Sequence, residues 1–145
     1  MTVTHTVLYA DDDLDDIQLL HEVFKHHSKN VHLLTFNDGL QILTYLENLT
    51  PEDIAPCLII LDINMPLMNG KETLVQLRKM ERYKDVPTIM FTTSSQPRDK
   101  EFAFKYNAGF ITKPINYKQL DRVADILIDH CAEEVKKKIK ISRLE

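Results

Sequence analysis

The fold is decided by CLIILDINMPLMNG, residues 57–70. Cys57–Leu61 is an unbroken apolar run that Asp62 ends, a pattern typical of a strand buried on both faces in a parallel sheet. The loop that follows is polar and contains the turn residues Pro66 and Gly70. Because ligands collect at the carboxyl ends of strands in open α/β sheets, Asp62 is a candidate functional residue. Taken alone, a carboxylate that caps the following turn is the alternative interpretation.

Composition is that of an ordinary globular protein with one domain. The chain has 145 residues, of which 43% are hydrophobic and 28% charged, enough for one substantial core. A net charge of −4 gives no overall attraction to nucleic acid or to an anionic membrane. The start of the chain does not resemble a signal peptide, and no apolar run reaches membrane-spanning length. We therefore expect a cytoplasmic protein that binds neither nucleic acid nor membrane.

Two further features have a simple interpretation. Both cysteines, Cys57 and Cys131, lie in apolar stretches, and no CxxC or Cys/His cluster suggests zinc. We interpret them as reduced, buried residues of a cytosolic protein. The lysines at 136–140 could form an arm for nucleic acid, but cations in the last turns of a helix are the favoured interpretation.

Apolar patterning predicts five strands that alternate with five helices. The expected strands are residues 6–10, 31–36, 57–62, 88–93 and 110–113. The expected helices are 14–27, 40–49, one after Gly70, one after Pro97 and one from about 116 through Cys131, continuing in part into the Lys-rich end. This alternation favours an α/β fold whose parallel sheet is covered on both faces by right-handed crossovers.

Polar side chains stand at the ends of four expected strands. Asp11 and Asp12 follow the first strand and Asp62 ends the third. Thr92 and Thr93 are the last two residues of the fourth strand, and Lys113 ends the fifth. Singly, each has a simpler interpretation: acids at a helix N-terminus, a hydroxyl satisfied by the backbone, and a surface charge. Jointly, they predict one pocket, because parallel strands end at the same edge of a sheet.

The chemistry of this set is that of phosphoryl transfer. Three close carboxylates repel one another, and a divalent cation relieves the repulsion. Mg²⁺ prefers hard oxygen ligands and often joins one or two carboxylates to a phosphate. A carboxylate can also form an aspartyl-phosphate, while a metal ion, an amine and a hydroxyl neutralise the transferring group. Asp62, Mg²⁺, Lys113 and Thr92 make up such a set.

The chain closely resembles the receiver domain of bacterial two-component response regulators, the family of the chemotaxis response regulator. The motifs that carry the resemblance are VLYADDD, LIILDINMPLMNG, PTIMFTTSS and GFITKP, in family order and spacing over roughly residues 6–131. The resemblance implies a doubly wound, flavodoxin-like fold with a five-stranded parallel sheet in the order 2-1-3-4-5. We expect a receiver domain at 1–131, then an extension of helix five and a basic tail at 132–145, with no separate output domain.

The resemblance also implies roles for residues at this edge. Asp62 is the expected phosphoacceptor, which receives the phosphoryl group from a sensor histidine kinase or a histidine phosphotransfer protein. Mg²⁺ is the expected cofactor, with Asp12 as a direct ligand beside Asp62. Asp11 would hold a metal-bound water, and Asn64 would offer its backbone carbonyl. Lys113 would pair with Asp62 and then with a phosphoryl oxygen.

Thr92 and Phe110 are the switch residues that the resemblance implies. The Thr hydroxyl would move onto the phosphoryl group, and the Phe ring would fill the vacated space. This would remodel the face made by helix four, strand five and helix five, which would bind an unidentified downstream protein or a second copy of the chain. Pro114 is expected to follow a cis peptide bond from Lys113, and Asn64 and Ser94 to line the path of the hydrolytic water.

Other functions compete with a phosphorylated single-domain regulator. One is a pseudo-receiver that acts as an unphosphorylated scaffold, and another is an intermediate that shuttles phosphoryl groups. An aspartate-nucleophile phosphatase would want an acid where Asn64 stands, and a flavodoxin-type cofactor binder would want a Gly-rich loop that three glycines do not provide. We expect a signalling protein whose only catalysis is its own phosphotransfer and autodephosphorylation.

Overall fold

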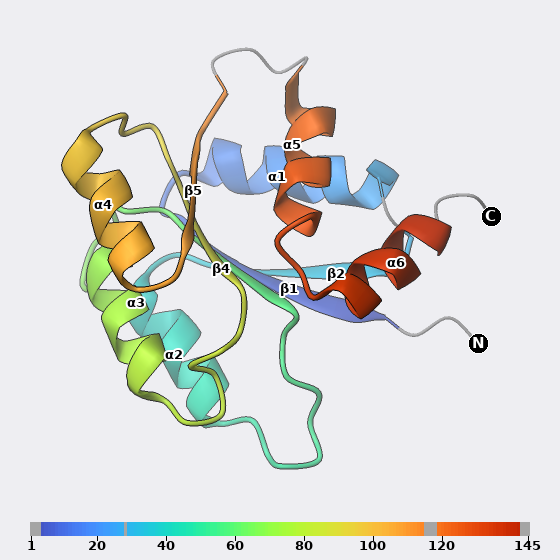
Figure 1. Ribbon diagram of the computed structural model, residues 1–145, viewed down its shortest axis with the longest axis horizontal. Helices are drawn as coiled ribbons and strands as arrows, with labels where there is room; N and C mark the ends of the chain where they lie inside the picture. Colours follow the sequence, from blue (N-terminus) through green and yellow to red (C-terminus); the bar gives the residue numbers. More distant parts are fainter. Residues whose placement is uncertain (1–3, 28, 115–118, 143–145) are drawn as a thin grey trace.

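The computed structural model describes residues 4–27, 29–114 and 119–142 and shows a parallel sheet between two layers of helices (Figure 1). The five strands are β1 (His5–Ala10), β2 (Val31–Phe36), β3 (Leu58–Leu61), β4 (Thr88–Thr92) and β5 (Gly109–Thr112). All pairs are parallel, and the order is β2-β1-β3-β4-β5. The α/β class and the strand order implied by the resemblance are confirmed.

Helices cover both faces of this sheet. Those described are α1 (Leu14–His27), α2 (Gly39–Glu47), α3 (Gly70–Lys79), α4 (Pro97–Lys105), α5 (Leu120–Ile128) and α6 (Glu133–Ser142). Helices α1, α5 and α6 bury side chains in one core cluster, and α2, α3 and α4 pack on the other. Among the described residues, none of the helices has the length and apolarity needed to cross a membrane.

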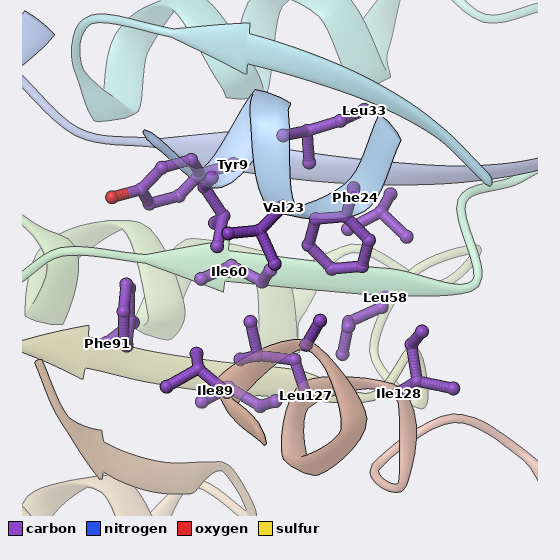
Figure 2. Packing of buried hydrophobic residues seen from close by; sticks show 14 of the residues in the cluster. Tyr9, Val23, Phe24, Leu33, Leu58, Ile60, Ile89, Phe91, Leu127 and Ile128 are labelled. Carbon is purple, nitrogen blue, oxygen red and sulfur yellow. The ribbon is translucent and has the colours of Figure 1, made fainter. Parts of the chain in front are cut away.

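The central strand β3 contributes side chains to both cores, because successive side chains of a strand point to opposite faces of the sheet. Leu58 and Ile60 belong to the core under α1 and α5, and Ile59 and Leu61 belong to the core on the other face. All four residues are fully buried. Figure 2 shows the first core, in which side chains of α1 and α5 lie over β3 and β4. The prediction of a strand buried on both faces is confirmed.

The Lys-rich end does not extend helix five, so that prediction is wrong. Helix α5 ends at Ile128, and α6 begins at Glu133 after a short turn. In a straight helix, Ile139 would lie about 16 Å beyond Ile128 along the axis. The turn instead brings Ile139 into the core as a fully buried residue, with Val135 packed beside it. Burial of these two apolar side chains favours the bent path. The predicted start of helix five, at about residue 116, lies outside the described residues.

Gly70, the first residue of α3, packs on the backbone that carries Asp62. A Cβ atom at Gly70 would collide with the carbonyl oxygen of Asp62, and the Gly70 N–H donates to the carbonyl of Ile63 at 2.8 Å. The φ angle of Gly70 is not positive, so the need for glycine is steric. The start of α3 therefore helps to fix the position of Asp62.

Replacing Gly70 with Ala should destabilise the protein, although Ala is the better helix former. We expect the free energy of unfolding to fall by about 1 to 3 kcal/mol, the usual cost of overpacking. Urea unfolding followed by circular dichroism measures this. The matched control is Gly109→Ala, where the added Cβ meets the side chain of His130, which can rotate away. Equal stability of Gly70→Ala and the unsubstituted protein would contradict the proposed contact.

Candidate functional site

Asp11 and Asp62 lie beside each other at the carboxyl edge of the sheet. Ala10 is paired with Leu61 in the β1–β3 register, and the Asp62 N–H donates to the Ala10 carbonyl at 3.0 Å. Both carboxylates are buried, whereas Asp12 is exposed. One carboxylate oxygen from each of these three acids lies within 4.8 Å of the others. The structure therefore brings the three predicted acids together.

Lys113 reaches this cluster from the end of β5. Its backbone N–H donates to the Thr92 carbonyl at 2.7 Å, which continues the β4–β5 ladder. Its Nζ lies 2.6 Å from Asp11 Oδ2 and 3.4 Å from Asp62 Oδ2. It also lies 2.8 Å from Asp16 Oδ2, in the first turn of α1. Lys113 thus contacts the predicted Asp62, but its nearest partner is Asp11.

Two groups of this site, Asp16 and Tyr9, were not predicted from the sequence. Asp16 is the second acid that holds Lys113, and the Tyr9 hydroxyl donates to Asp11 Oδ2 at 2.5 Å. Asp16 stands one helical turn after Asp12, so the spacing places it toward the same edge. Tyr9 is the one aromatic in an otherwise aliphatic run and precedes Asp11 by two, which puts both on one face of the strand.

Burial and repulsion set the electrostatics of the site. Burial, together with the charge on Asp11, raises the pKa of Asp62 to about 6, although Lys113 opposes the shift. Burial alone would lower the pKa of Lys113, but its hydrogen bonds to Asp11 and Asp16 raise it above its usual value. The amine is therefore a fixed positive charge among four carboxylates, those of Asp11, Asp12, Asp16 and Asp62. Hard oxygen ligands with excess negative charge fit Mg²⁺ or a similar divalent cation.

Thr92 is fully buried at the end of β4, next to a polar network. Its Oγ1 accepts a hydrogen bond from the Ser94 N–H at 3.3 Å. The Ser94 hydroxyl donates to Asp99 Oδ2 at 2.5 Å, and Lys71 Nζ lies 2.5 Å from Asp99 Oδ1. Asp99 is buried, and its hydrogen bonds with Lys71 and Ser94 lower its pKa. The loop between β4 and α4 is therefore held by a charged pair that joins α3 to α4.

The remaining predicted residues are placed less centrally. Phe110 is half-buried on β5 and packs against the core cluster on the α3 and α4 side. Asn64 is exposed in the loop after β3, two residues beyond Asp62.

The described residues contain no cis peptide bond, so the bond between Lys113 and Pro114 is trans and the prediction of a cis bond is wrong. The trans form before proline is intrinsically favoured by about 0.5 to 1 kcal/mol.

Comparison with known proteins identifies a family for most of the chain. Residues 7–125 match the family described as the response regulator receiver domain. The response regulator Rcp1 from Synechocystis sp. (strain ATCC 27184 / PCC 6803 / Kazusa) is 28% identical over 117 residues, which span 79% of this chain and 80% of that protein.

Solved structures give the same result. The Mn²⁺-bound form of response regulator Rcp1 superposes with a TM-score of 0.75 at 25% identity, covering 83% of this chain and 92% of that one. A two-component response regulator from Legionella pneumophila gives a TM-score of 0.71 at 33% identity, covering 87% and 99%. The family match spans most of the chain and includes all the site residues described above, from Asp11 to Lys113. The chain therefore belongs to the response regulator receiver domain family.

Proposed function

We propose that this protein is a response regulator that accepts a phosphoryl group on Asp62, given by a histidine of a sensor kinase or of a histidine phosphotransfer protein. The observation that carries the proposal is the buried amine of Lys113. It contacts carboxylates that follow β1 and β3 and one from the first turn of α1. A buried cation held among acids at the carboxyl edge of a parallel sheet is the arrangement that phosphoryl transfer needs.

Asp62 is suited to be the nucleophile. Its Oδ1 accepts a hydrogen bond from the Ile63 N–H at 2.8 Å, which fixes the carboxylate. Its Oδ2 faces Lys113 at 3.4 Å. With a pKa of about 6, the group is ionised at neutral pH and able to attack phosphorus. Lys113 would then balance charge on a phosphoryl oxygen.

The same residues would hold Mg²⁺. We propose Asp12 and Asp62 as direct ligands, Asp11 as the acid that holds a bound water, and the Asn64 backbone carbonyl as a further ligand. The exposure of Asp12 leaves room for the waters that Mg²⁺ keeps. When bound, the ion supplies positive charge that offsets repulsion among the carboxylates and the charge of the incoming phosphoryl group.

The output is proposed to be a shift of population between two conformations. A phosphoryl group on Asp62 adds strong hydrogen-bond acceptors at the site. The Thr92 hydroxyl would donate to it and give up its contact with Ser94, and Phe110 would fill the space that Thr92 leaves. The face of α4, β5 and α5 would change and bind a downstream protein, or a second copy of the chain, in the cytoplasm.

Replacing Asp62 with Asn should abolish phosphorylation and keep the fold, because the Asn side-chain oxygen can still accept from Ile63. Protein is incubated with Mg²⁺ and acetyl phosphate, and its mass is measured. We expect the unsubstituted protein to gain the mass of one phosphoryl group and the variant to gain none.

The matched control for this experiment is Asp38→Asn. It removes another buried acid, which caps α2, and Asn caps helices equally well. This control should be phosphorylated normally. A labelled Asp62→Asn variant would show that another residue is the acceptor, and an unlabelled parent protein would favour an unphosphorylated scaffold.

Replacing Lys113 with Ala should leave Mg²⁺ binding intact but prevent the conformational change that follows phosphorylation. The acids lose their internal cation, so without metal the free energy of unfolding should fall by about 3 kcal/mol, the usual cost of leaving buried charges unpaired. Mg²⁺ should still bind and should restore more stability than in the parent. Phosphorylation should no longer shift amide resonances of α4 and β5. Resonance shifts equal to those of the parent would contradict the role given to Lys113.

A control for this variant is Lys140→Ala. It removes a partly exposed ion pair with Asp129. We expect its stability to change by less than about 1 kcal/mol.

The raised pKa of Asp62 predicts a pH dependence of stability in EDTA. The folded protein holds this proton up to about pH 6, whereas the unfolded chain releases it near pH 4. The carboxyl group therefore contributes stability that is complete below about pH 4 and is lost as pH rises through about 6. The Asp62→Asn variant has no ionisable group at this position, so it does not lose this stability as pH rises. Urea unfolding should find the variant more stable than the parent by about 1 to 2 kcal/mol at about pH 7.5. The two should differ little near pH 4, and an equal difference at both pH values would contradict the assignment.

A further inference from the structure

Two thiols from distant parts of the sequence meet at the edge of the sheet opposite Asp62. Cys57 directly precedes β3, and its N–H donates to the Thr6 carbonyl at 2.9 Å. Cys131 lies in the turn between α5 and α6. The two sulfur atoms are 4.0 Å apart, with the Cys131 thiol directed as donor at Cys57 Sγ. Because Asp62 follows the other end of β3, the thiol pair and the acidic cluster lie at opposite ends of one strand.

The two thiols differ in their surroundings. Cys131 is only 5% exposed, whereas Cys57 is half-buried and is the member of the pair that a small molecule can reach. The hydrogen bond from Cys131 lowers the pKa of Cys57. The same contact and burial raise the pKa of Cys131. Cys57 is therefore the thiol that ionises first, with Cys131 beside it as a second thiol.

We propose that Cys57 and Cys131 form a reversible intramolecular disulfide when the protein meets a hydroperoxide. A disulfide needs a sulfur separation of about 2 Å, so the two atoms must approach by about 2 Å. Neither residue lies inside a helix or a strand. Rotation of the side chains and a small shift of the turn that carries Cys131 can supply this movement.

The reaction takes two steps that balance. The Cys57 thiolate attacks one peroxide oxygen; the S–O bond forms, the O–O bond breaks, and the leaving oxygen takes a proton to become water or an alcohol. Cys131 sulfur then attacks the Cys57 sulfenic acid; the S–S bond forms, the S–O bond breaks, and the thiol proton leaves with the hydroxyl as water. Two thiols are oxidised by two electrons in total, and one peroxide is reduced. A dithiol reductant reverses the change.

The cross-link would tie the turn between α5 and α6 to the start of β3. It closes a loop from residue 57 to 131, which contains β3, α3, β4, α4, β5 and α5. A covalent bond across so long a loop restricts the unfolded chain. We expect the melting temperature to rise by roughly 5 to 15 °C. The bond is remote from the carboxyl edge of the sheet, so labelling of Asp62 by acetyl phosphate should not change, and the proposal does not depend on the phosphoacceptor.

The test treats the whole folded protein with a slight excess of hydrogen peroxide. Free thiols are then counted under denaturing conditions, the intact mass is measured, and Cys57 and Cys131 peptides are sought as a cross-linked pair. We expect both thiols to be lost, the mass to fall by two hydrogen atoms, and the rise in melting temperature to disappear after dithiothreitol. Two free thiols, or a disulfide-linked dimer, would overturn the proposal.

Single Cys→Ser variants assign the two roles. In Cys131→Ser, the sulfenic acid on Cys57 has no partner and should be trapped by dimedone. In Cys57→Ser, we expect no dimedone adduct, because the buried Cys131 is protected. Peroxide should raise the melting temperature of neither variant. Trapping in Cys57→Ser alone would overturn the assignment of Cys57 as the attacking thiol. A rise in melting temperature in either variant would show that the stabilisation does not come from this bond.

Discussion

The contact between the Lys113 ammonium and the carboxylates of β1, α1 and β3 is the constraint on which the site depends. Strands β1 and β5 are separated by β3 and β4, so their ends lie about 14 Å apart at the usual strand spacing. A long side chain is needed to bridge part of that distance, and Lys113 passes the Phe91 ring with its Nζ 5.9 Å from the ring centroid. The strand order and the length of one lysine together decide that the amine meets Asp11.

This interaction is costly to fold, which indicates that it serves function rather than stability. Removing charged groups from water costs several kcal/mol per ion, and mutual attraction offsets this only with good geometry. Here one amine contacts three carboxylates, those of Asp11, Asp16 and Asp62, and the exposed Asp12 lies beside two of these acids. Burial and the charge on Asp11 raise the pKa of Asp62, although Lys113 opposes the shift. Burying apolar side chains at this edge of the sheet would cost less free energy than burying these charged groups. We propose that the residual negative charge favours binding of a divalent cation and, with it, of phosphate.

Local pattern predicted most of the fold, because each strand is a short apolar run ended by a polar residue, as in Leu58–Leu61 before Asp62. The same rule placed the acids and Lys113 at one edge. Apart from the local contact of Tyr9 with Asp11, what it missed depends on distant contacts. The break before α6 follows from burial of Ile139 in a core that the local sequence does not display. The pairing of Asp16 with Lys113 joins residues 97 positions apart, so no local pattern contains it.

In the loop after β4, a chain of polar contacts helps to hold the conformation. Thr92, Ser94, Asp99 and Lys71 form one chain of hydrogen bonds from the site to the junction of α3 and α4. Hydrogen bonds to charged groups contribute about 1.5 to 3 kcal/mol each. A phosphoryl group offers between one and three charge-assisted bonds of similar strength. The two sets of contacts are thus close enough in free energy that the proposed phosphorylation of Asp62 would shift the population of this loop. The fully buried residues of β3 have no comparable alternative contacts.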